Sequence, residues 1–228
     1  MRLVTIGVGA QNSPRFAPAG LLVAHRGVRV MLDGGPGAEP PSRLDAWLVT
    51  DERAELIAGI RRLARNRDLD VRAADFESGG LRVLCRPVVH TSHPTSGYLM
   101  VVSDPPIKVV WAPEFLEFPN WAAGADLMFA EASGWNRPIR FTGGVGGHLD
   151  TLSVAREARG HRIRRLVFAH IGRPTIRAMD SGERPPFGEF ARDGQAFVVR
   201  EPAKRRGHPS PGLGRVGTRH DAQSIGLD

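Results

Sequence analysis

The side chains best suited to chemistry are histidines and carboxylates that follow short apolar runs. The first set occupies a polar corner, in which Asp51, Arg53 and Glu55 separate the apolar run 46–50 from a helical pattern. A corner between a strand and a helix lies at the mouth of an α/β core, where polar side chains can converge on a ligand. We therefore expect these three residues to line a binding pocket.

Two histidines lie three residues apart in a loop that follows the predicted strand 81–89. They are His90 and His93, and such a pair is unusual for packing alone. Histidine is both a proton carrier and a common metal ligand. We expect at least one of the two to line a functional pocket, with packing in the core as the alternative.

Four further candidates lie at the ends of predicted elements. Glu114 comes after the strand 109–111, Glu131 in the strand 125–132, His148 before the helix 152–159, and His170 after the strand 164–169.

The elements that must position these side chains are mostly strands. The chain has 27 glycines and 18 prolines, which indicates many tight turns and a strand-rich fold. The spacing of Leu56, Ile60, Leu63 and their neighbours predicts a helix with one face toward a core. Further elements are a hairpin of the runs 21–24 and 28–32, a helix over 173–180 and a final strand over 196–200.

The length of 228 residues fits one large domain or two small ones. We expect one domain over residues 1–200, because residues 201–228 have no periodicity and few large apolar side chains. This basic tail is predicted to be disordered. Cys85 is the only cysteine, which excludes an intramolecular disulfide and a cysteine-cluster metal site.

The charge and hydropathy of the chain limit its partners. A net charge of +7 favours anionic partners, such as a phosphate-containing small molecule or nucleic acid, although a solvated basic surface is the alternative. The chain has no secretory leader pattern and no apolar run long enough to span a membrane. We therefore expect a cytoplasmic protein that does not bind membranes.

The polar corner resembles a motif of the metallo-β-lactamase-fold hydrolases. In that family a strand ends in Thr and continues as His-x-His-x-Asp-His before a helix that begins Ile-Gly-Gly-Leu. Here the strand ends at Thr50, and the four ligand positions hold Asp51, Arg53, Glu55 and Leu56. The resemblance implies an αββα sandwich of two mixed β-sheets flanked by helices, with a degenerate metal motif.

The order of the early segments is similar to one branch of this family. An early glycine turn, a loop with proline and arginine, a hairpin and Leu-Asp-x-Gly-Pro-Gly resemble the tRNA 3′-end ribonucleases and the cyclic phosphodiesterases. In that branch the early loop borders the active site, so Asn12, Ser13 and Arg15 become candidate phosphate contacts. A solvated turn is the alternative.

The resemblance also suggests roles for the later residues. It implies that His90, ahead of His93, is a metal ligand, and that Glu114 replaces a bridging Asp. His170 matches the last metal ligand, His148 matches a catalytic histidine, and Glu131 lies near the pocket as an acid or base.

Three functions follow from this incomplete motif. In the first, the protein has lost the two-metal site and is a non-catalytic binding protein, in which the guanidinium of Arg53 replaces the positive charge of the metal. In the second, one divalent metal, with zinc as the first choice, is held by His90, Glu114 and His170 in a hydrolase of phosphodiesters or other esters. In the third, the protein is an accessory that binds nucleic acid. Homodimer formation stays open.

Overall fold

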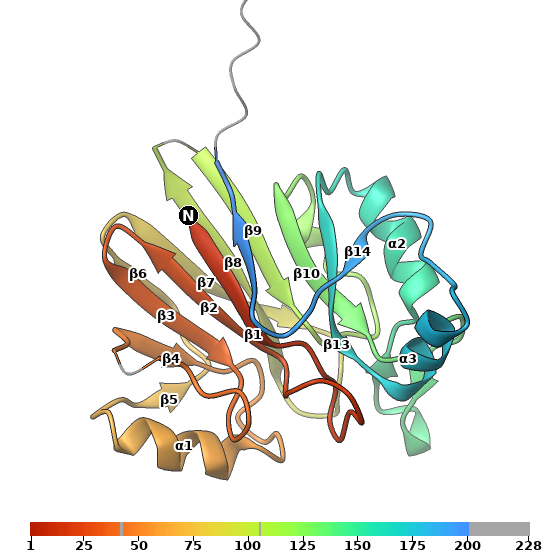
Figure 1. Ribbon diagram of the computed structural model, residues 1–228, viewed down its shortest axis with the longest axis horizontal. Coiled ribbons are helices and arrows are strands. Elements are labelled where there is room, and N and C mark those ends of the chain that lie inside the picture. Colours follow the sequence, from red (N-terminus) through yellow and green to blue (C-terminus); the bar gives the residue numbers. More distant parts are fainter. Residues whose placement is uncertain (42, 105, 201–228) are drawn as a thin grey trace, which may run out of the picture.

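The structure of the protein, a computed structural model, describes residues 1–41, 43–104 and 106–200. The predicted tail, residues 201–228, lies outside the described residues. Two large mixed β-sheets form a sandwich, with α1 at one side of the molecule and α2 and α3 at the other (Figure 1). This arrangement confirms the predicted fold class.

The first sheet contains six strands in the order β15-β1-β2-β3-β4-β5. A two-residue loop joins β2 and β3, and both of its residues, Arg26 and Gly27, have positive φ, as tight hairpin loops require. The predicted hairpin is thus confirmed. The strands are β1 (Arg2–Gly7), β2 (Gly20–His25), β3 (Val28–Asp33), β4 (Ala46–Leu48), β5 (Val71–Arg72) and β15 (Gln195–Val198).

The second sheet contains seven strands in the order β14-β13-β10-β9-β8-β7-β6. A short ribbon of β11 (Ile139–Arg140) and β12 (Gly147–His148) forms a separate sheet. The seven strands are β6 (Phe76–Ser78), β7 (Leu81–Val88), β8 (Thr95–Ser103), β9 (Pro106–Ala112), β10 (Leu127–Ala132), β13 (Leu166–Ile171) and β14 (Glu189–Phe190).

Three α-helices flank the sheets in the described part of the chain. Helix α1 (Ile57–Arg65) packs Ile60 and Ala64 against Trp47 of the first sheet. Helix α2 (Thr151–Gly160) lies against β10 and β13, and the Asp150 carboxylate caps it by accepting a hydrogen bond from the Ser153 N–H. Helix α3 is Arg173–Asp180, as predicted, and two short 3-10 turns are Asn120–Ala122 and Thr142–Gly144.

Strands β10 and β13 are neighbouring interior strands of the second sheet, and every residue of both strands is buried. Their sequences are apolar except near their carboxyl ends, where β10 contains Glu131 and β13 contains His170. A parallel strand covered on both faces favours continuous apolar residues. Two ionisable side chains at the ends of such strands therefore mark the place where a functional site is expected.

Candidate functional site

A bulge in β13 directs His170 into the site. The pairing of β13 with β10 runs regularly to Phe168 opposite Ala130, and then shifts so that Ile171 pairs with Ala132. Two residues of β13 thus lie opposite Glu131 alone. His170 has a φ of 57°, which costs a residue with a Cβ about 1–2 kcal/mol. Bulges of this kind re-aim side chains next to active sites.

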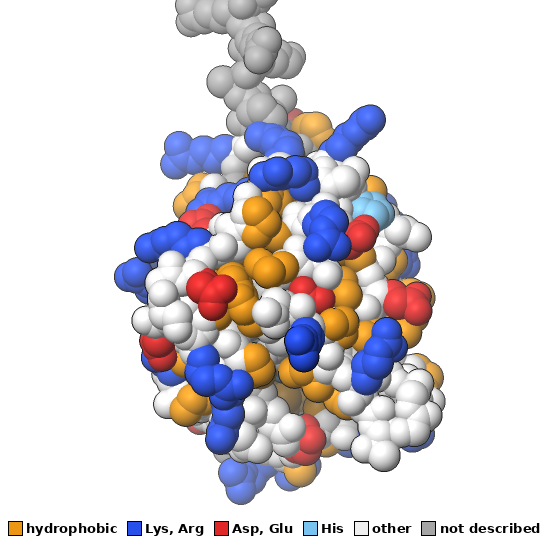
Figure 2. Space-filling view, turned by 90° about the vertical axis from the view of Figure 1, so that its right-hand side faces the viewer, with side chains coloured by type: hydrophobic (Ala, Val, Ile, Leu, Met, Phe, Trp, Pro, Cys, Tyr) orange, Lys and Arg blue, Asp and Glu red, His pale blue; other side chains and the backbone are white. Residues whose placement is uncertain are grey.

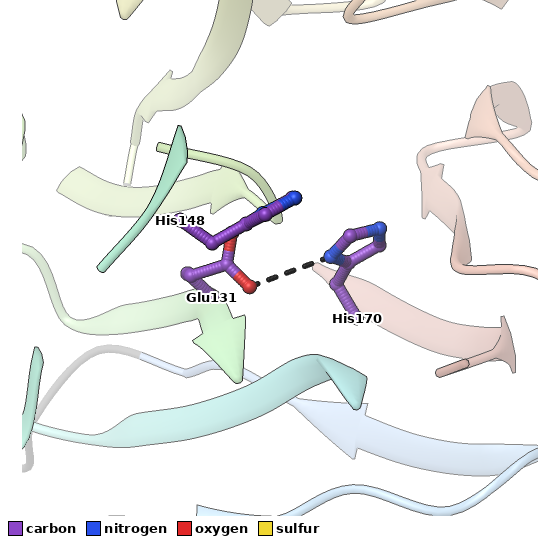
Figure 3. Close-up of side chains that lie close together, drawn as sticks. All are labelled: Glu131, His148 and His170. Atoms are coloured by element: carbon purple, nitrogen blue, oxygen red, sulfur yellow. Dashed lines mark hydrogen bonds and ion pairs between the residues drawn. The ribbon is translucent and has the colours of Figure 1, made fainter. Parts of the chain in front are cut away.

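The carboxylate of Glu131 is the buried acceptor at the centre of this cluster (Figure 3). It accepts hydrogen bonds from the backbone N–H groups of Ser133 at 2.7 Å and Phe115 at 3.3 Å. It also lies 2.7 Å from Nδ1 of His148 and 3.4 Å from Nδ1 of His170. Because a buried carboxylate requires such partners, these contacts fix both its position and its charge.

Strand β12 brings His148 to the cluster through a close backbone approach. The N–H of Gly147 donates a 2.8 Å hydrogen bond to the carbonyl of His90. A Cβ at Gly146 would overlap that same carbonyl, and a Cβ at Gly147 would overlap the carbonyl of Ile139. Glycine at 146 therefore lets this segment lie beside the His90 loop, and glycine at 147 lets β12 lie close to β11.

Glu114 follows the end of β9 by two residues, and its carboxylate lies between two histidines. Its Oε2 is 3.2 Å from Nε2 of His90, and its Oε1 is 2.6 Å from Nε2 of His170. Together with Glu131 and His148, these residues form an alternating chain of imidazoles and carboxylates. We call this chain the His–Glu chain; its members are His90, Glu114, His170, Glu131 and His148.

The Nδ1 atoms of all three histidines in the His–Glu chain face hydrogen-bond acceptors. Nδ1 of His90 lies 2.9 Å from the carbonyl of Gly147, which can only accept, so this nitrogen carries a proton. Nδ1 of His148 and of His170 face Glu131, and the Ser133 hydroxyl lies 2.9 Å from Nδ1 of His170. The Nε2 atoms of His90 and His170 therefore remain for Glu114 and for a ligand.

The charges of the chain strongly perturb its pKa values. Burial acts to lower the pKa of His170, but the carboxylates of Glu114 and Glu131 outweigh it and raise that pKa to about 10. Burial acts to raise the pKa of Glu131, but His148 and then His170 outweigh it and lower that pKa to about 2. The pKa of Glu114 falls well below its ordinary value against the effect of burial, mainly through His170.

An open cavity of about 470 Å³ lies over the His–Glu chain. We call it the histidine cavity. Asp51 and His93 form a pair at its wall, with Nε2 of His93 2.9 Å from both carboxylate oxygens. The structure thus brings most of the candidates together. The ionisable residues that line the cavity are Asp51, Arg53, Glu55, His90, His93, Glu114, His148, His170 and Arg173.

The three candidates from the early loop do not all lie at the site. Asn12 and Ser13 line a second cavity of about 350 Å³ next to the histidine cavity, together with Leu56. Arg15 lines neither cavity; its Nη2 forms an ion pair with Asp180 at the end of α3 and lies 2.8 Å and 2.9 Å from the two carboxylate oxygens. Leu56, at the last ligand position of the degenerate motif, packs against the apolar cluster under α1.

Three residues of the site were not among the candidates from the sequence. Ser133 contacts His170, and Arg173 lines the histidine cavity. Asp33 accepts hydrogen bonds from the N–H and hydroxyl of Thr50 and from Nε1 of Trp111, and burial raises its pKa to about 6. In the sequence, the Asp-Gly-Gly turn pointed to Asp33, and Arg173 follows the candidate His170 by only three positions. No feature of the sequence pointed to Ser133.

No protein-family profile matches the sequence, and no curated protein matches it. The fold, however, is shared with many solved structures, and it is the metallo-β-lactamase fold. One of these structures, described as a metallo-β-lactamase-fold protein from Bacillus subtilis, covers 86% of this chain and 99% of its own, with a TM-score of 0.63 and 16% identity.

Two other structures extend this likeness. A diphosphatase of the PhnP family has a TM-score of 0.67 and 15% identity, and the match covers 86% of this chain and 97% of the diphosphatase. The short form of human tRNase Z has a TM-score of 0.61 and 13% identity, and the match covers 88% and 100%. At these identities the likeness concerns the fold, and the site must be judged from its own side chains.

The His–Glu chain includes a candidate metal site. Ligand atoms of Glu131, His148 and His170 lie within 4.8 Å of one another (Figure 3). Glu131 already accepts two backbone hydrogen bonds, so it is suited to orienting histidines that bind a metal, without binding the metal itself.

Among the described residues, no helix is long and apolar enough to cross a membrane.

Proposed function

We propose that the protein is a metal-dependent hydrolase of phosphate esters that uses one divalent ion. His90, Glu114 and His170 would hold the ion, and zinc fits this set of imidazole and carboxylate donors. The observation that carries the proposal is the orientation of the histidines, because buried acceptors hold their Nδ1 atoms and leave Nε2 of His90 and His170 on either side of Glu114. A bound divalent ion polarises a phosphoryl oxygen and activates water.

His148 is the proposed catalytic residue for proton transfer. Its Nδ1 is held by Glu131, so Nε2 is the nitrogen left to give a proton to the departing ester oxygen. Glu131 is fully buried and has a pKa of about 2. It therefore acts as a positioning residue that orients His148 and His170, and not as an acid or base.

Two arginines favour an anionic substrate. Arg53 and Arg173 are exposed and line the histidine cavity from different elements. Arginine binds phosphate oxygens through paired N–H donors, and Arg173 begins α3, whose N-terminus favours negative charge. Two of the structurally similar proteins, a diphosphatase and a tRNase Z, are named for activities on phosphate-containing substrates, which agrees with this proposal.

A non-catalytic binding protein is the second candidate. It is favoured by Arg53 and Leu56, which occupy two ligand positions of the degenerate motif with a cation and an apolar side chain. It is also favoured by the direct contacts of Glu114 with both histidines, since these ion pairs need no metal to satisfy their charges. This candidate would bind an anionic ligand in the same cavity without hydrolysing it.

Nucleic acid remains a candidate partner because of the positive net charge. On the face that carries α2 and α3, however, Lys and Arg side chains are spread among acidic and apolar ones (Figure 2). A partner bound mainly through its phosphates would show an affinity that falls steeply with salt. Binding that is absent even at low salt would exclude this partner.

The test measures metal content and hydrolysis in the same samples. Untagged protein is analysed for zinc, manganese and iron, and assayed with bis(p-nitrophenyl) phosphate and p-nitrophenyl acetate. We expect about one ion per chain and a preference for the phosphodiester. Glu114→Ala should lose the metal and the activity, whereas His148→Asn should keep the metal and lose about 10²-fold or more in rate.

His161→Asn is the matched control, because His161 lies at the end of α2 outside both cavities. It should keep both metal and activity. Protein that binds no metal after incubation with excess zinc would overturn the hydrolase proposal and leave the binding candidate. If Glu114→Ala retains the metal and Glu131→Ala loses it, the ion is instead bound by Glu131, His148 and His170.

A further inference from the structure

The second cavity opens directly beside the histidine cavity and differs from it in chemistry. Its volume is about 350 Å³, and we call it the apolar cavity. Asp51, Glu55, Glu114 and His170 line both cavities, so the two are continuous at the His–Glu chain. Away from this boundary the walls are mostly apolar, with Phe16, Pro18, Ala19, Val49, Leu56 and Ile60.

The apolar cavity lies where the turn after β3 meets the start of α1. Gly35 has a φ of 119°, and a Cβ at this position would lie 2.9 Å from Ile60 and 3.8 Å from Leu56. Glycine therefore lets the turn approach the helix closely. Because Leu56 has an apolar side chain where the degenerate motif would place a metal ligand, the space beside His170 is bordered by hydrocarbon.

The polar groups in the wall of the apolar cavity are already satisfied or lie at its rim. One oxygen of Asp33 accepts two hydrogen bonds from Thr50, at 2.7 Å and 3.0 Å, and the other accepts one from Trp111 at 2.6 Å. Gln11 and Asn12 are exposed at the surface. An apolar group could therefore enter without leaving a buried hydrogen-bonding group unpaired, which is the main cost of such burial.

We propose that the apolar cavity binds the aromatic or branched alkyl group of a substrate whose phosphate lies at the His–Glu chain. This inference rests on the proposed function and specifies its substrate class as esters of phosphate with a bulky apolar group. The volume is adequate, since an apolar cavity of about 150 Å³ accepts benzene. A methyl group would leave most of the cavity without contacts.

The test compares the equilibrium binding of phenylphosphonate and methylphosphonate to the full chain by titration calorimetry. Both are non-hydrolysable, and each is titrated into chelator-treated and into zinc-loaded protein, so no catalytic activity is needed. We expect phenylphosphonate to bind at least about 10-fold more tightly. Equal affinities for the two compounds would overturn the inference, whatever the metal content.

Two alanines of the early loop provide a matched pair of variants. Ala19 lines the apolar cavity, whereas Ala17 lines neither cavity. Ala19→Leu should reduce the preference for the phenyl compound to less than about 3-fold by filling space, and Ala17→Leu should leave it unchanged. An unchanged preference in folded Ala19→Leu protein would place the phenyl group elsewhere and overturn the inference.

A third measurement separates this inference from the proposed function. If neither phosphonate binds, the phosphate site is wrong, and the cavity is tested alone with fluorobenzene by ¹⁹F NMR. Broadening of the fluorobenzene signal by the wild-type and Ala17→Leu proteins, but not by Ala19→Leu, would retain the apolar cavity as a binding site. No broadening by the wild-type protein would overturn it.

Discussion

The Glu131 carboxylate accepts a 2.7 Å hydrogen bond from Nδ1 of His148, and the carboxylate is completely buried. The two residues come from β10 and from the separate ribbon of β11 and β12. This contact ties the ribbon to an interior strand of the second sheet, and it fixes which nitrogen of His148 is left for a substrate.

Glu131→Gln should impair catalysis more than metal binding. Glutamine keeps the size of the side chain, but it has one acceptor oxygen for four donors. We expect a loss of stability of about 1–3 kcal/mol from unsatisfied partners and a fall in kcat of about 10²-fold. Denaturant titration, metal analysis and phosphodiester assays would measure these effects. A variant with unchanged kcat would contradict the positioning role of Glu131.

Histidines at the degenerate motif positions should increase the metal content. Leu56 lines the apolar cavity beside Glu114 and His170, and Arg53 lines the histidine cavity. The double variant Arg53→His/Leu56→His should therefore raise bound zinc by about one ion per chain, as measured by elemental analysis. Leu63→His, within α1 and outside both cavities, is the control and should bind no additional ion.

Metal-free protein should be most stable between about pH 4.5 and 6.5. The folded pKa of His170 is raised from 6.5 to about 10, so its stabilising effect is complete below pH 6.5 and is lost as the pH rises toward 10. The folded pKa of Glu131 is lowered from 4.5 to about 2, so its effect is complete above pH 4.5 and is lost as the pH falls toward 2.

Denaturant unfolding of chelator-treated protein across this pH range would measure both losses. His170→Gln should show a smaller loss of stability between pH 6.5 and 10 than the wild type, because the titrating group is gone. His161→Gln, outside the site, should keep the wild-type slope. A wild-type stability that rises across pH 6.5–10 would contradict the assigned direction.

Gly146→Ala should disrupt the site, because its Cβ would overlap the carbonyl of His90. We expect a loss of at least about 3 kcal/mol from this overlap and the positive φ. Gly144→Ala is the matched control: Gly144 also has positive φ, but a Cβ there meets nothing within 4 Å, so its cost should be about 1–2 kcal/mol. Equal losses in thermal unfolding would show that the overlap is relieved cheaply.

Trp111→Phe should destabilise the protein by about 1–3 kcal/mol, because it removes the donor to Oδ2 of Asp33 and leaves a carboxylate oxygen unpaired. Trp121→Phe is the control, since Nε1 of Trp121 donates to the carbonyl of Pro87 at a more exposed position. That loss should be about 0.5–1.5 kcal/mol. Urea titration of both variants measures the difference, and a larger loss for Trp121→Phe would contradict the role of Asp33.

Much of the fold could be predicted from local patterns. The spacing of apolar residues indicated the helix that begins near Leu56, and Arg173–Asp180 was predicted with its observed bounds. Asp150 is a typical N-cap residue, and it caps α2. The final strand is Gln195–Val198, slightly earlier than predicted, because an alternating pattern indicates a strand but does not define its ends.

The contacts within the site could not be predicted in the same way. Arg15 looked equivalent to Asn12 in the early loop, yet it pairs with Asp180, which comes much later in the sequence. The glycines near His148 were visible in the sequence, but the reason for Gly146 is a neighbouring carbonyl from the His90 loop. Such reasons depend on packing between segments that are distant in the chain.

The sequence by itself determined the order of strands and helices and placed histidines and carboxylates at their ends, because burial imposes a period on local residues. Only the tertiary structure decided that the bulge at His170 turns that side chain toward Glu114, that Glu131 holds two histidines by Nδ1, and that an apolar cavity opens beside them. These features arise where two sheets and their loops pack together, and local periodicity does not encode the distances between them.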